Sequence, residues 1–341
     1  GDHPDCAGAL GFNSEFAMKN RADYAYWTGA KALFCSCMLL CAPVQARAQV
    51  HRADASGSAT ITAPGSYAYS MVFGGHKRLY RVHVPASYVP GKPVPLVFAL
   101  HGGGGNMDYQ ANDTYYGQIA QAEKDGYAVV FPNGFSRLPG GKLATWNAGN
   151  CCGAARDKGI DDVGFVREIV RRLKTTLSVD ARRIYANGMS NGGMMAYRLA
   201  CDAPDVFRAV ASVAGTDNTA SCAPAKAVSV LHIHARDDEM VLFNGGAGRD
   251  RSAVTDFVAV PDSVAKWVRL NACSVTPKRV LEKSGAYCDS YSPCRDGAEV
   301  KLCVTETGGH SWPGGAKVRG GTAGSSALSA TGEIAAFFGS H

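Results

Sequence analysis

Apolar segments of two kinds alternate along the chain from about residue 78. Short continuous apolar runs, such as Pro95 to Leu100 and Tyr127 to Phe131, are typical of strands buried on both faces of a sheet. The stretch from Asp161 to Leu177 instead repeats its apolar residues at helical spacing. This alternation predicts an α/β fold with a mostly parallel central sheet and helices on both faces.

The same patterns give the remaining elements. Further strands are expected over Leu79 to Val84, Arg183 to Ala186, Ala209 to Val213, Val228 to His234 and Val300 to Val304. Further helices are expected over Met194 to Ala200, Ser263 to Leu270 and Ala327 to Phe338. No internal repeat and no linker rich in Pro, Thr or Ser divides this part of the sequence, so we expect residues 49–341 to form a single domain.

The first 48 residues differ from the rest. A positive start at Met18 to Arg21, an apolar stretch at Ala32 to Val44, and Ala46-Arg47-Ala48 predict an export signal that begins at Met18 and is cleaved near Ala48. The apolar stretch is shorter than the roughly 20 residues that span a bilayer, which disfavours a membrane anchor. Residues 1–17 are interpreted as sequence upstream of the signal. We therefore expect a secreted or periplasmic mature protein without membrane attachment.

Composition and charge exclude other classes. Hydrophobic residues make up 46% of the chain and charged residues 19%, which is typical of a globular protein. The 35 Lys and Arg against 29 Asp and Glu give a net charge of +6. Spread over 341 residues without a sustained basic stripe, this charge is too dilute to follow a phosphate backbone. Nucleic acid is therefore not an expected partner.

Eight cysteines follow the export signal. An even number of cysteines in an exported chain predicts disulfide bonds. From their positions along the expected helices and loops we predict four bridges: Cys201 with Cys222, Cys273 with Cys303, Cys288 with Cys294, and Cys151 with Cys152. These eight contain no Cys-x-x-Cys pair and no histidine at ligand spacing, so a metal site is not expected.

The most specific motif is Gly188-Met189-Ser190-Asn191-Gly192, which lies between an expected strand and an expected helix. In this position a G-x-S-x-G motif predicts a nucleophile elbow, a turn so tight that the serine takes strained backbone angles and glycines must flank it. The turn would lift the hydroxyl of Ser190 clear of the sheet at the N-terminus of the next helix, where negative charge is stabilised. A Gly-rich turn without chemistry is the alternative.

A serine needs a base to become a nucleophile, and the base needs an acid to orient it. His310 follows the strand expected over Val300 to Val304 and lies in a Gly-rich loop, which makes it the candidate base. Three acidic residues follow the strand that ends near His234, and the residues alone do not choose among Asp237, Asp238 and Glu239. His232 and His234 lie two apart on that strand and are interpreted as core or loop-anchoring residues rather than metal ligands.

The run His101-Gly102-Gly103-Gly104-Gly105-Asn106 follows the strand at Pro95 to Leu100. A Gly-rich turn after a strand can direct backbone N–H groups at an oxyanion. It could also cradle a phosphate, but it lacks the Gly-Lys-Ser/Thr ending of a phosphate-binding loop. We therefore interpret it as part of an oxyanion hole.

Taken together, several motifs resemble one family, the secreted polyhydroxybutyrate depolymerases and feruloyl esterases of the α/β-hydrolase fold. The resemblance covers the chain from about residue 70 to its end, and its motifs are His101 to Asn106, Trp146 to Gly149 with Cys151 to Gly153, Asp161 to Phe165, Gly188 to Met194, and Gly309 to Gly314.

The resemblance implies Ser190 as nucleophile, His310 as base, and an oxyanion hole from the backbone N–H groups of Gly103 and Asn191. The family's acid follows a His-Gly-Thr-x-Asp pattern, which falls on His234 to Asp238 and selects Asp238. Ala235 and Arg236 replace the usual Gly and Thr, so Asp237 remains a second choice.

The sequence thus predicts a secreted serine carboxylesterase that acts on feruloyl-type or other small aromatic or short-chain esters, and that needs no cofactor. Trp146 and Trp312 are candidates for the substrate groove, because an aromatic face suits a phenolic acyl group or a polyester chain. A polyhydroxybutyrate depolymerase, a peptidase, and a binding module on an inactive hydrolase fold are the alternatives. Asp161 and Asp162 are interpreted as the cap of a helix.

Overall fold

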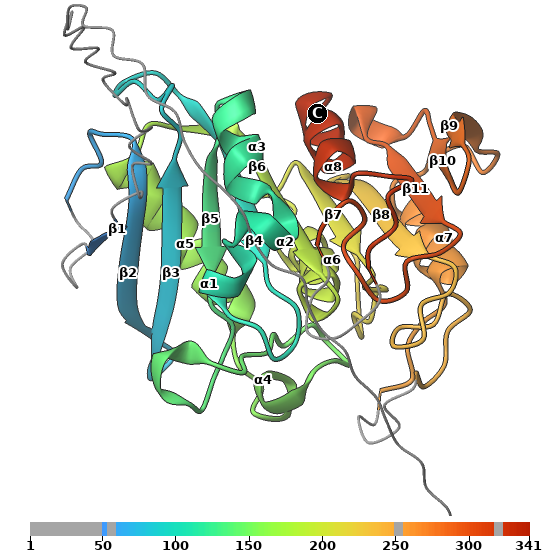
Figure 1. Ribbon diagram of the computed structural model, residues 1–341, viewed down its shortest axis with the longest axis horizontal. Coiled ribbons are helices and arrows are strands. Elements are labelled where there is room, and N and C mark those ends of the chain that lie inside the picture. Colours follow the sequence, from blue (N-terminus) through green and yellow to red (C-terminus); the bar gives the residue numbers. More distant parts are fainter. Residues whose placement is uncertain (1–49, 53–58, 249–254, 317–322) are drawn as a thin grey trace, which may run out of the picture. The chain divides into compact units, whose positions relative to one another are not determined.

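The computed structural model describes residues 50–52, 59–248, 255–316 and 323–341 (Figure 1). Residues 47–341 cluster as one compact unit. The predicted export signal from Met18 to Ala48 lies outside the described residues. In the parts that are described, no helix has both the length and the apolar character needed to cross a membrane.

The described strands form one eleven-stranded sheet in the order β1-β2-β3-β5-β4-β6-β7-β8-β11-β10-β9. Their bounds are β1 (Val50–Arg52), β2 (Gly65–Phe73), β3 (His76–Val84), β4 (Val94–Leu100), β5 (Ala128–Pro132), β6 (Val179–Met189), β7 (Ala209–Val213), β8 (Ser229–Ala235), β9 (Lys278–Lys283), β10 (Ala286–Tyr291) and β11 (Val300–Thr305). The six adjacent strands from β5 to β11 in this order run parallel. Antiparallel strands flank them on both sides, β3 and β2 at one edge and β10 and β9 at the other.

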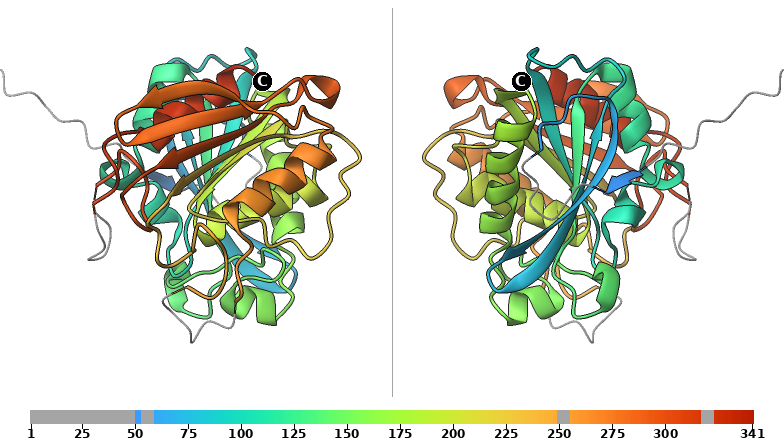
Figure 2. Two further views of the ribbon diagram at one scale, coloured as in Figure 1. Left: turned by 90° about the vertical axis from the view of Figure 1, so that its right-hand side faces the viewer. Right: turned by 90° about the vertical axis from the view of Figure 1, so that its left-hand side faces the viewer.

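Helices cover both faces of this sheet (Figure 2). Their bounds are α1 (Met107–Gln110), α2 (Asp113–Tyr116), α3 (Gln118–Asp125), α4 (Gly153–Asp157), α5 (Asp162–Thr176), α6 (Asn191–Asp202), α7 (Val260–Leu270) and α8 (Ala330–Gly339). Apolar side chains of α5, α6 and α7 share one buried cluster on one face, and those of α8 and α3 belong to two clusters on the other. The predicted fold class, a mostly parallel sheet with helices on both faces, is confirmed.

Burial explains which strands the sequence revealed. Every residue of β5, β7 and β8 is buried, and these strands read as continuous apolar runs. The edge strand β9 has a polar sequence with five of its six residues exposed, and no apolar pattern predicts it. The sequence patterns therefore do not predict the hairpin that β10 forms with β9.

The topology brings four loops together at the carboxyl ends of the parallel strands. His101 follows β4, Ser190 follows β6, Asp238 follows β8, and His310 follows β11. Because these four strands are parallel, their carboxyl ends lie on the same side, which is where open α/β sheets bind ligands.

The disulfides differ from the prediction in two of four bridges. Cys201 bonds to Cys222 and Cys151 to Cys152, as predicted. The predicted bridges Cys273–Cys303 and Cys288–Cys294 are wrong, because Cys288 bonds to Cys303 and Cys273 to Cys294. The reason is the hairpin of β10 and β11, in which Cys288 and Cys303 lie directly opposite each other with their Cα atoms 4.0 Å apart.

Candidate active site

Ser190 occupies a strained turn between β6 and α6. Its φ of 54° and ψ of −121° lie outside the backbone regions that residues other than glycine usually adopt. Its backbone N–H donates to the carbonyl of Val213 at 2.8 Å, which holds the turn against β7. Ser190 is the N-cap of α6, so its hydroxyl lies beside the positive end of that helix.

The two flanking glycines allow the turn to close. A Cβ on Gly192 would overlap the carbonyl oxygens of Leu100 and His101 at the end of β4, and a Cβ on Gly188 would overlap the backbone of Gly192. Both positions therefore accept no larger residue. This packing is the structural basis of the G-x-S-x-G spacing.

His310 lies between Ser190 and Asp238. Its Nε2 is 2.9 Å from the Ser190 Oγ, and its Nδ1 is 2.9 Å from the Asp238 Oδ2. A carboxylate accepts hydrogen bonds, so the Nδ1–H donates to Asp238 and the Nε2 is left to accept the hydroxyl proton of Ser190. This is the arrangement of a nucleophile, a general base and an orienting acid.

The neighbouring Asp237 has a different partner. Its Oδ1 accepts the backbone N–H of Gly309 at 2.8 Å, which ties the loop of β8 to the loop that carries His310. Asp237 therefore contacts the backbone beside His310, whereas Asp238 contacts the imidazole ring.

Four donors surround the carboxylate of Asp238. Its Oδ1 accepts the backbone N–H groups of Met240 at 2.8 Å and Val241 at 2.9 Å, and its Oδ2 faces His310 and, at 3.3 Å, the Nε2 of His234. Burial by itself raises the pKa of Asp238, but the hydrogen bonds from His234 and His310 outweigh it and hold this pKa well below its ordinary value. The carboxylate is therefore ionised wherever the protein is folded near neutral pH.

Gly103 and Asn191 lie next to each other beside the elbow. A Cβ on Gly103 would be 3.6 Å from the Cβ of Asn191. Asn191 is the first residue of α6, where a backbone N–H has no partner within its helix. The Asn191 side chain is fully used, since its Oδ1 accepts the N–H of Trp146 at 2.7 Å and its Nδ2 donates to the Trp146 carbonyl at 3.0 Å.

The two tryptophans predicted to line a substrate groove are buried. Trp146 is 0% exposed, packs against the ring of His101, and donates its Nε1–H to the His101 carbonyl at 2.9 Å. Trp312 is 3% exposed, contacts Tyr116 edge to face, and donates its Nε1–H to Thr331 at 2.9 Å. The prediction that their rings meet substrate is therefore wrong. Trp146 instead packs against the loop that follows β4, and Trp312 is a buried part of the loop that carries His310.

Asp161 and Asp162 have different roles. Asp161 caps α5, accepting the N–H of Gly164 at 2.7 Å, as the sequence indicated. Asp162 is buried and forms an ion pair with Arg78 at 2.6 Å. It also accepts the N–H of Asn147 at 2.8 Å, which fixes the loop next to Trp146.

His232 and His234 are core residues, as the sequence predicted, and His234 also anchors the loop after β8. Both are buried on β8, the rings are stacked, and His232 Nε2 lies 3.0 Å from His234 Nδ1. His234 reaches Asp238, so it touches the candidate acid directly. The signal in the sequence was the spacing: two histidines on one side of a strand that ends at the acid.

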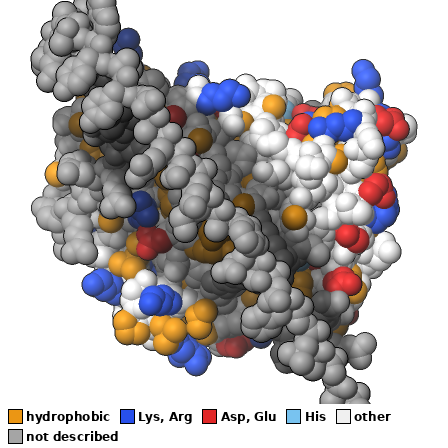
Figure 3. Space-filling model, viewed as in Figure 1, with side chains coloured by type: hydrophobic (Ala, Val, Ile, Leu, Met, Phe, Trp, Pro, Cys, Tyr) orange, Lys and Arg blue, Asp and Glu red, His pale blue; other side chains and the backbone are white. Residues whose placement is uncertain are grey.

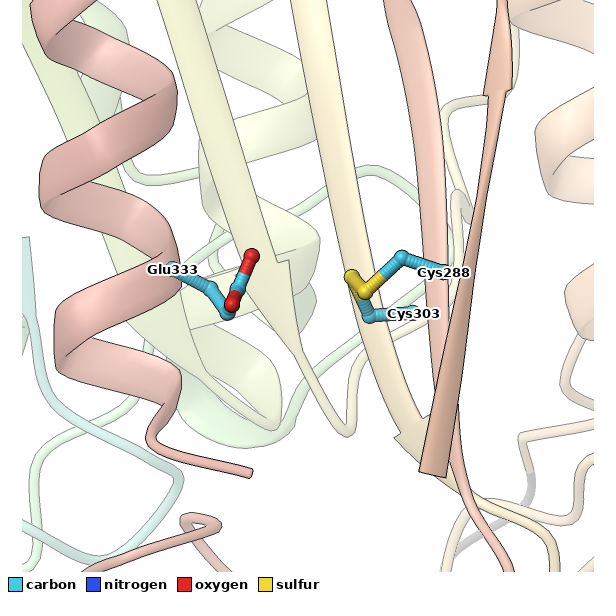
Figure 4. Close-up of side chains that lie close together, drawn as sticks. All are labelled: Cys288, Cys303 and Glu333. Carbon is cyan, nitrogen blue, oxygen red and sulfur yellow. A yellow bond between two sulfur atoms is a disulfide. The ribbon is translucent and has the colours of Figure 1, made fainter. Parts of the chain in front are cut away.

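One cluster has the composition of a metal site. The ligand atoms of Cys288, Cys303 and Glu333 lie within 4.8 Å of one another (Figure 4). However, the two sulfur atoms form a disulfide and offer no thiolate. The Glu333 carboxylate pairs with Lys301 at 3.0 Å. These residues therefore do not fit a metal ion as they stand.

The described surface carries both signs of charge. On the face seen in Figure 3, Lys and Arg side chains are interspersed with Asp and Glu. Ion pairs among the described residues include those of Arg81 with Asp108 and Arg279 with Asp289. Such a surface gives no strong field of one sign.

Sequence comparison identifies relatives of this chain. Residues 80–266 match the family Esterase PHB depolymerase. Feruloyl esterase B of Piromyces equi is 30% identical over 236 residues, which are 67% of this chain and 42% of that protein. Putative esterase NocK of Nocardia uniformis subsp. tsuyamanensis is 30% identical over 268 residues, which are 73% of this chain and 74% of that protein. The chain thus spans less than half of the first of these relatives and about three quarters of the second.

Comparison with solved structures agrees on the fold. The acetyl xylan esterase from Aspergillus awamori superposes with a TM-score of 0.51 at 12% sequence identity, covering 77% of this chain and 94% of that one. At this identity the likeness concerns the fold alone. With the family match over more than half of its length, the chain belongs to the Esterase PHB depolymerase family of carboxylic ester hydrolases with the α/β-hydrolase fold.

Proposed function

We propose that this chain is a serine carboxylesterase that works through an acyl-enzyme on Ser190. The observation that carries the proposal is the continuous line of contacts from Asp238 through His310 to Ser190, with 2.9 Å at each step. Its position at the carboxyl ends of parallel strands, on a strained elbow, supports the same reading.

The proposed reaction has two halves. His310 Nε2 takes the hydroxyl proton as Ser190 Oγ attacks the ester carbonyl, and the backbone N–H groups of Gly103 and Asn191 stabilise the oxyanion that forms. The C–O bond to the alcohol then breaks, and His310 returns its proton to the leaving oxygen. Water repeats these steps on the acyl-enzyme and releases the acid. Asp238 keeps its proton-free form throughout and stabilises the imidazolium.

For the substrate we propose feruloyl-type or other small aromatic or short-chain esters. The support is the activity of relatives such as the feruloyl esterase B of Piromyces equi. Trp146 and Trp312 give no support for an aromatic acyl group through stacking, because both rings are buried. A polyester of hydroxybutyrate is the second candidate, and the name of the matched family favours it. A binding module on an inactive fold is disfavoured by the intact line of contacts.

We also propose that the protein is secreted or periplasmic, with residues 1–48 removed and residues 49–341 forming the catalytic domain. Four disulfides in the described residues support an oxidising compartment.

Turnover of a p-nitrophenyl short-chain ester tests the activity. The Ser190→Ala variant should lose roughly 10⁴-fold or more in kcat, while Ser221→Ala, which changes an exposed serine, should keep wild-type turnover. Full activity of Ser190→Ala would refute the proposal. Release of ferulate from methyl ferulate, measured beside clearing of a polyhydroxybutyrate suspension, separates the two substrate classes.

A further inference from the structure

A line of buried side chains continues from the candidate acid into the core. His234 Nε2 lies 2.8 Å from the Val241 carbonyl and 3.3 Å from Asp238 Oδ2. His234 Nδ1 lies 3.0 Å from His232 Nε2, and His232 Nδ1 lies 2.8 Å from the hydroxyl of Tyr197. His232 and His234 are at most 1% exposed, and Tyr197 is 0% exposed.

The donors and acceptors along this line allow one arrangement of its hydrogen bonds. A carbonyl and a carboxylate only accept, so His234 carries its proton on Nε2 and its Nδ1 must accept. His232 then donates from Nε2, and its Nδ1 accepts the hydroxyl proton of Tyr197. Every polar atom of the two rings is used when both are neutral. Burial, and next the neighbouring His234, lower the pKa of His232 well below its ordinary value, which agrees with a neutral ring.

The line also closes on the nucleophile. Tyr197 lies on α6, the helix that Ser190 opens. The path therefore runs from the elbow along α6 to Tyr197, across β8 through His232 and His234, to Asp238, and back through His310 to Ser190. The same set of side chains therefore links α6, which follows the candidate nucleophile, to the loop that carries the candidate acid.

The charged and titratable groups around this line are few in the described residues. Asp217, which follows β7, acts on Tyr197 and is held by Trp267 Nε1 at 2.8 Å and Lys266 Nζ at 3.0 Å, both from α7. On the other side, Phe243 contacts the ring of His234 edge to face and separates it from Arg236. Among the described residues, Asp238 is the only carboxylate that pairs with His232 or His234.

We propose that His234, fixed in one tautomer by His232 and Tyr197, is a positioning residue that aims the carboxylate of Asp238 at His310. This inference rests on the proposed function. His234 binds both ends of the turn that holds the acid, because it contacts the Asp238 side chain and the Val241 carbonyl, while the Val241 N–H donates to Asp238. Loss of its Nε2–H frees the turn and removes one donor from the carboxylate.

Two kinetic effects follow. A displaced acid misorients the imidazole in the transition state, so kcat falls while KM changes little. A carboxylate with one donor fewer attracts the imidazolium more strongly, so the acidic limb of the kcat/KM profile moves to higher pH. A residue that only stabilises the fold would shift neither quantity.

The experiment measures kcat, KM and the pH profile on a p-nitrophenyl ester for four variants, with thermal unfolding as a check on folding. His234→Leu should lose about 10- to 100-fold in kcat with KM within about threefold. His234→Gln, which keeps a donor near the Nε2 position, should restore kcat to within about threefold of wild type. Tyr197→Phe removes only the hydroxyl at the far end of the line and should lower kcat about threefold.

His83→Leu is the matched control, because His83 is a buried histidine on β3 that bonds to Ser66 and Glu123. It should lose stability and keep its kcat. If His234→Leu does not fold, Tyr197→Phe decides the matter through its kcat and its pH profile. A wild-type kcat and an unmoved acidic limb in folded His234→Leu, or in Tyr197→Phe where His234→Leu does not fold, would overturn the inference. If Ser190→Ala and His310→Ala also retain activity, the proposed function fails instead.

Discussion

Asp238 and His310, 72 positions apart in the chain, lie 2.9 Å apart with the carboxylate facing the Nδ1 of the ring. The preceding residue, Asp237, points to the backbone of Gly309 instead. The end of β8 thus presents two carboxylates with different partners. A shift of one residue in this turn would exchange the two.

This difference predicts unequal effects of two similar substitutions. Asp238→Asn should reduce kcat by about 10⁴-fold, because an amide cannot hold the imidazole in the required tautomer or stabilise its charge. Asp237→Asn should stay within about tenfold of wild type, since the amide oxygen can still accept the N–H of Gly309. Initial rates on a p-nitrophenyl ester measure both. The assignment of the acid is wrong if Asp237→Asn is the more damaging change.

The elbow predicts a steric limit at Gly192. Gly192→Ala should destabilise the protein by several kcal/mol or abolish activity, because the added Cβ overlaps backbone oxygens at the end of β4 that cannot move aside. Gly339→Ala is the control, since an added Cβ there meets no atom within 4 Å and the residue lies in the last turn of α8. Chemical unfolding of both variants makes the comparison. Equal stability of the two would contradict the packing described here.

Because His232 is buried, we expect the free energy of unfolding to decrease already at pH values well above those at which carboxylates titrate. Its pKa is lowered in the folded state, while the unfolded chain takes up a proton near the ordinary value of about 6.5. As pH falls below that value only the unfolded state gains the proton, so the free energy of unfolding decreases by about 1.4 kcal/mol per pH unit for this group. The lowered pKa of Asp238 affects stability at more acidic pH, because the stabilisation that the ionised carboxylate provides is lost only below about pH 3.9.

Urea unfolding at pH 7, 6 and 5 measures this slope. His232→Gln should flatten it by close to one proton. Ser221→Ala, which changes an exposed residue that does not titrate, should leave the slope unchanged. A His232→Gln slope equal to that of wild type would mean that the ring is protonated in the folded protein.

The revised disulfide pattern can be read directly. Peptide mapping without reduction should yield one peptide pair containing Cys288 with Cys303 and another containing Cys273 with Cys294. Replacing both Cys288 and Cys303 by Ala should lower the free energy of unfolding by about 3 kcal/mol, from the chain entropy of a loop of about 15 residues. Recovery of Cys288 linked to Cys294 would contradict the structure.

The sequence was informative where burial or sterics leave little choice. The fully buried strands β7 and β8 read as apolar runs, and the elbow of Ser190 follows from glycines that nothing else can replace. The choice of Asp238 over Asp237 needed the family pattern, because both residues carry the same side chain and only the turn after β8 decides which one faces His310.

Other features depend on tertiary contacts with no local signature. An aromatic residue in a motif looks the same whether its ring meets substrate or, like Trp146, fills space beneath a loop. The pairing of Cys288 with Cys303 depends on the register of the hairpin of β10 and β11, in which the two cysteines lie opposite each other. The contact of His234 with Asp238 depends on how the chain turns after β8.

The central claim is that Ser190 is the nucleophile, and labelling with a fluorophosphonate tests it most directly, because the probe forms a covalent bond with an activated serine. Mass spectrometry of the intact protein and its peptides should find one probe per chain, attached to Ser190, and none in the Ser190→Ala variant, while Ser221→Ala labels as wild type does. Stoichiometric labelling that persists in Ser190→Ala, or that maps to another residue, would contradict the account.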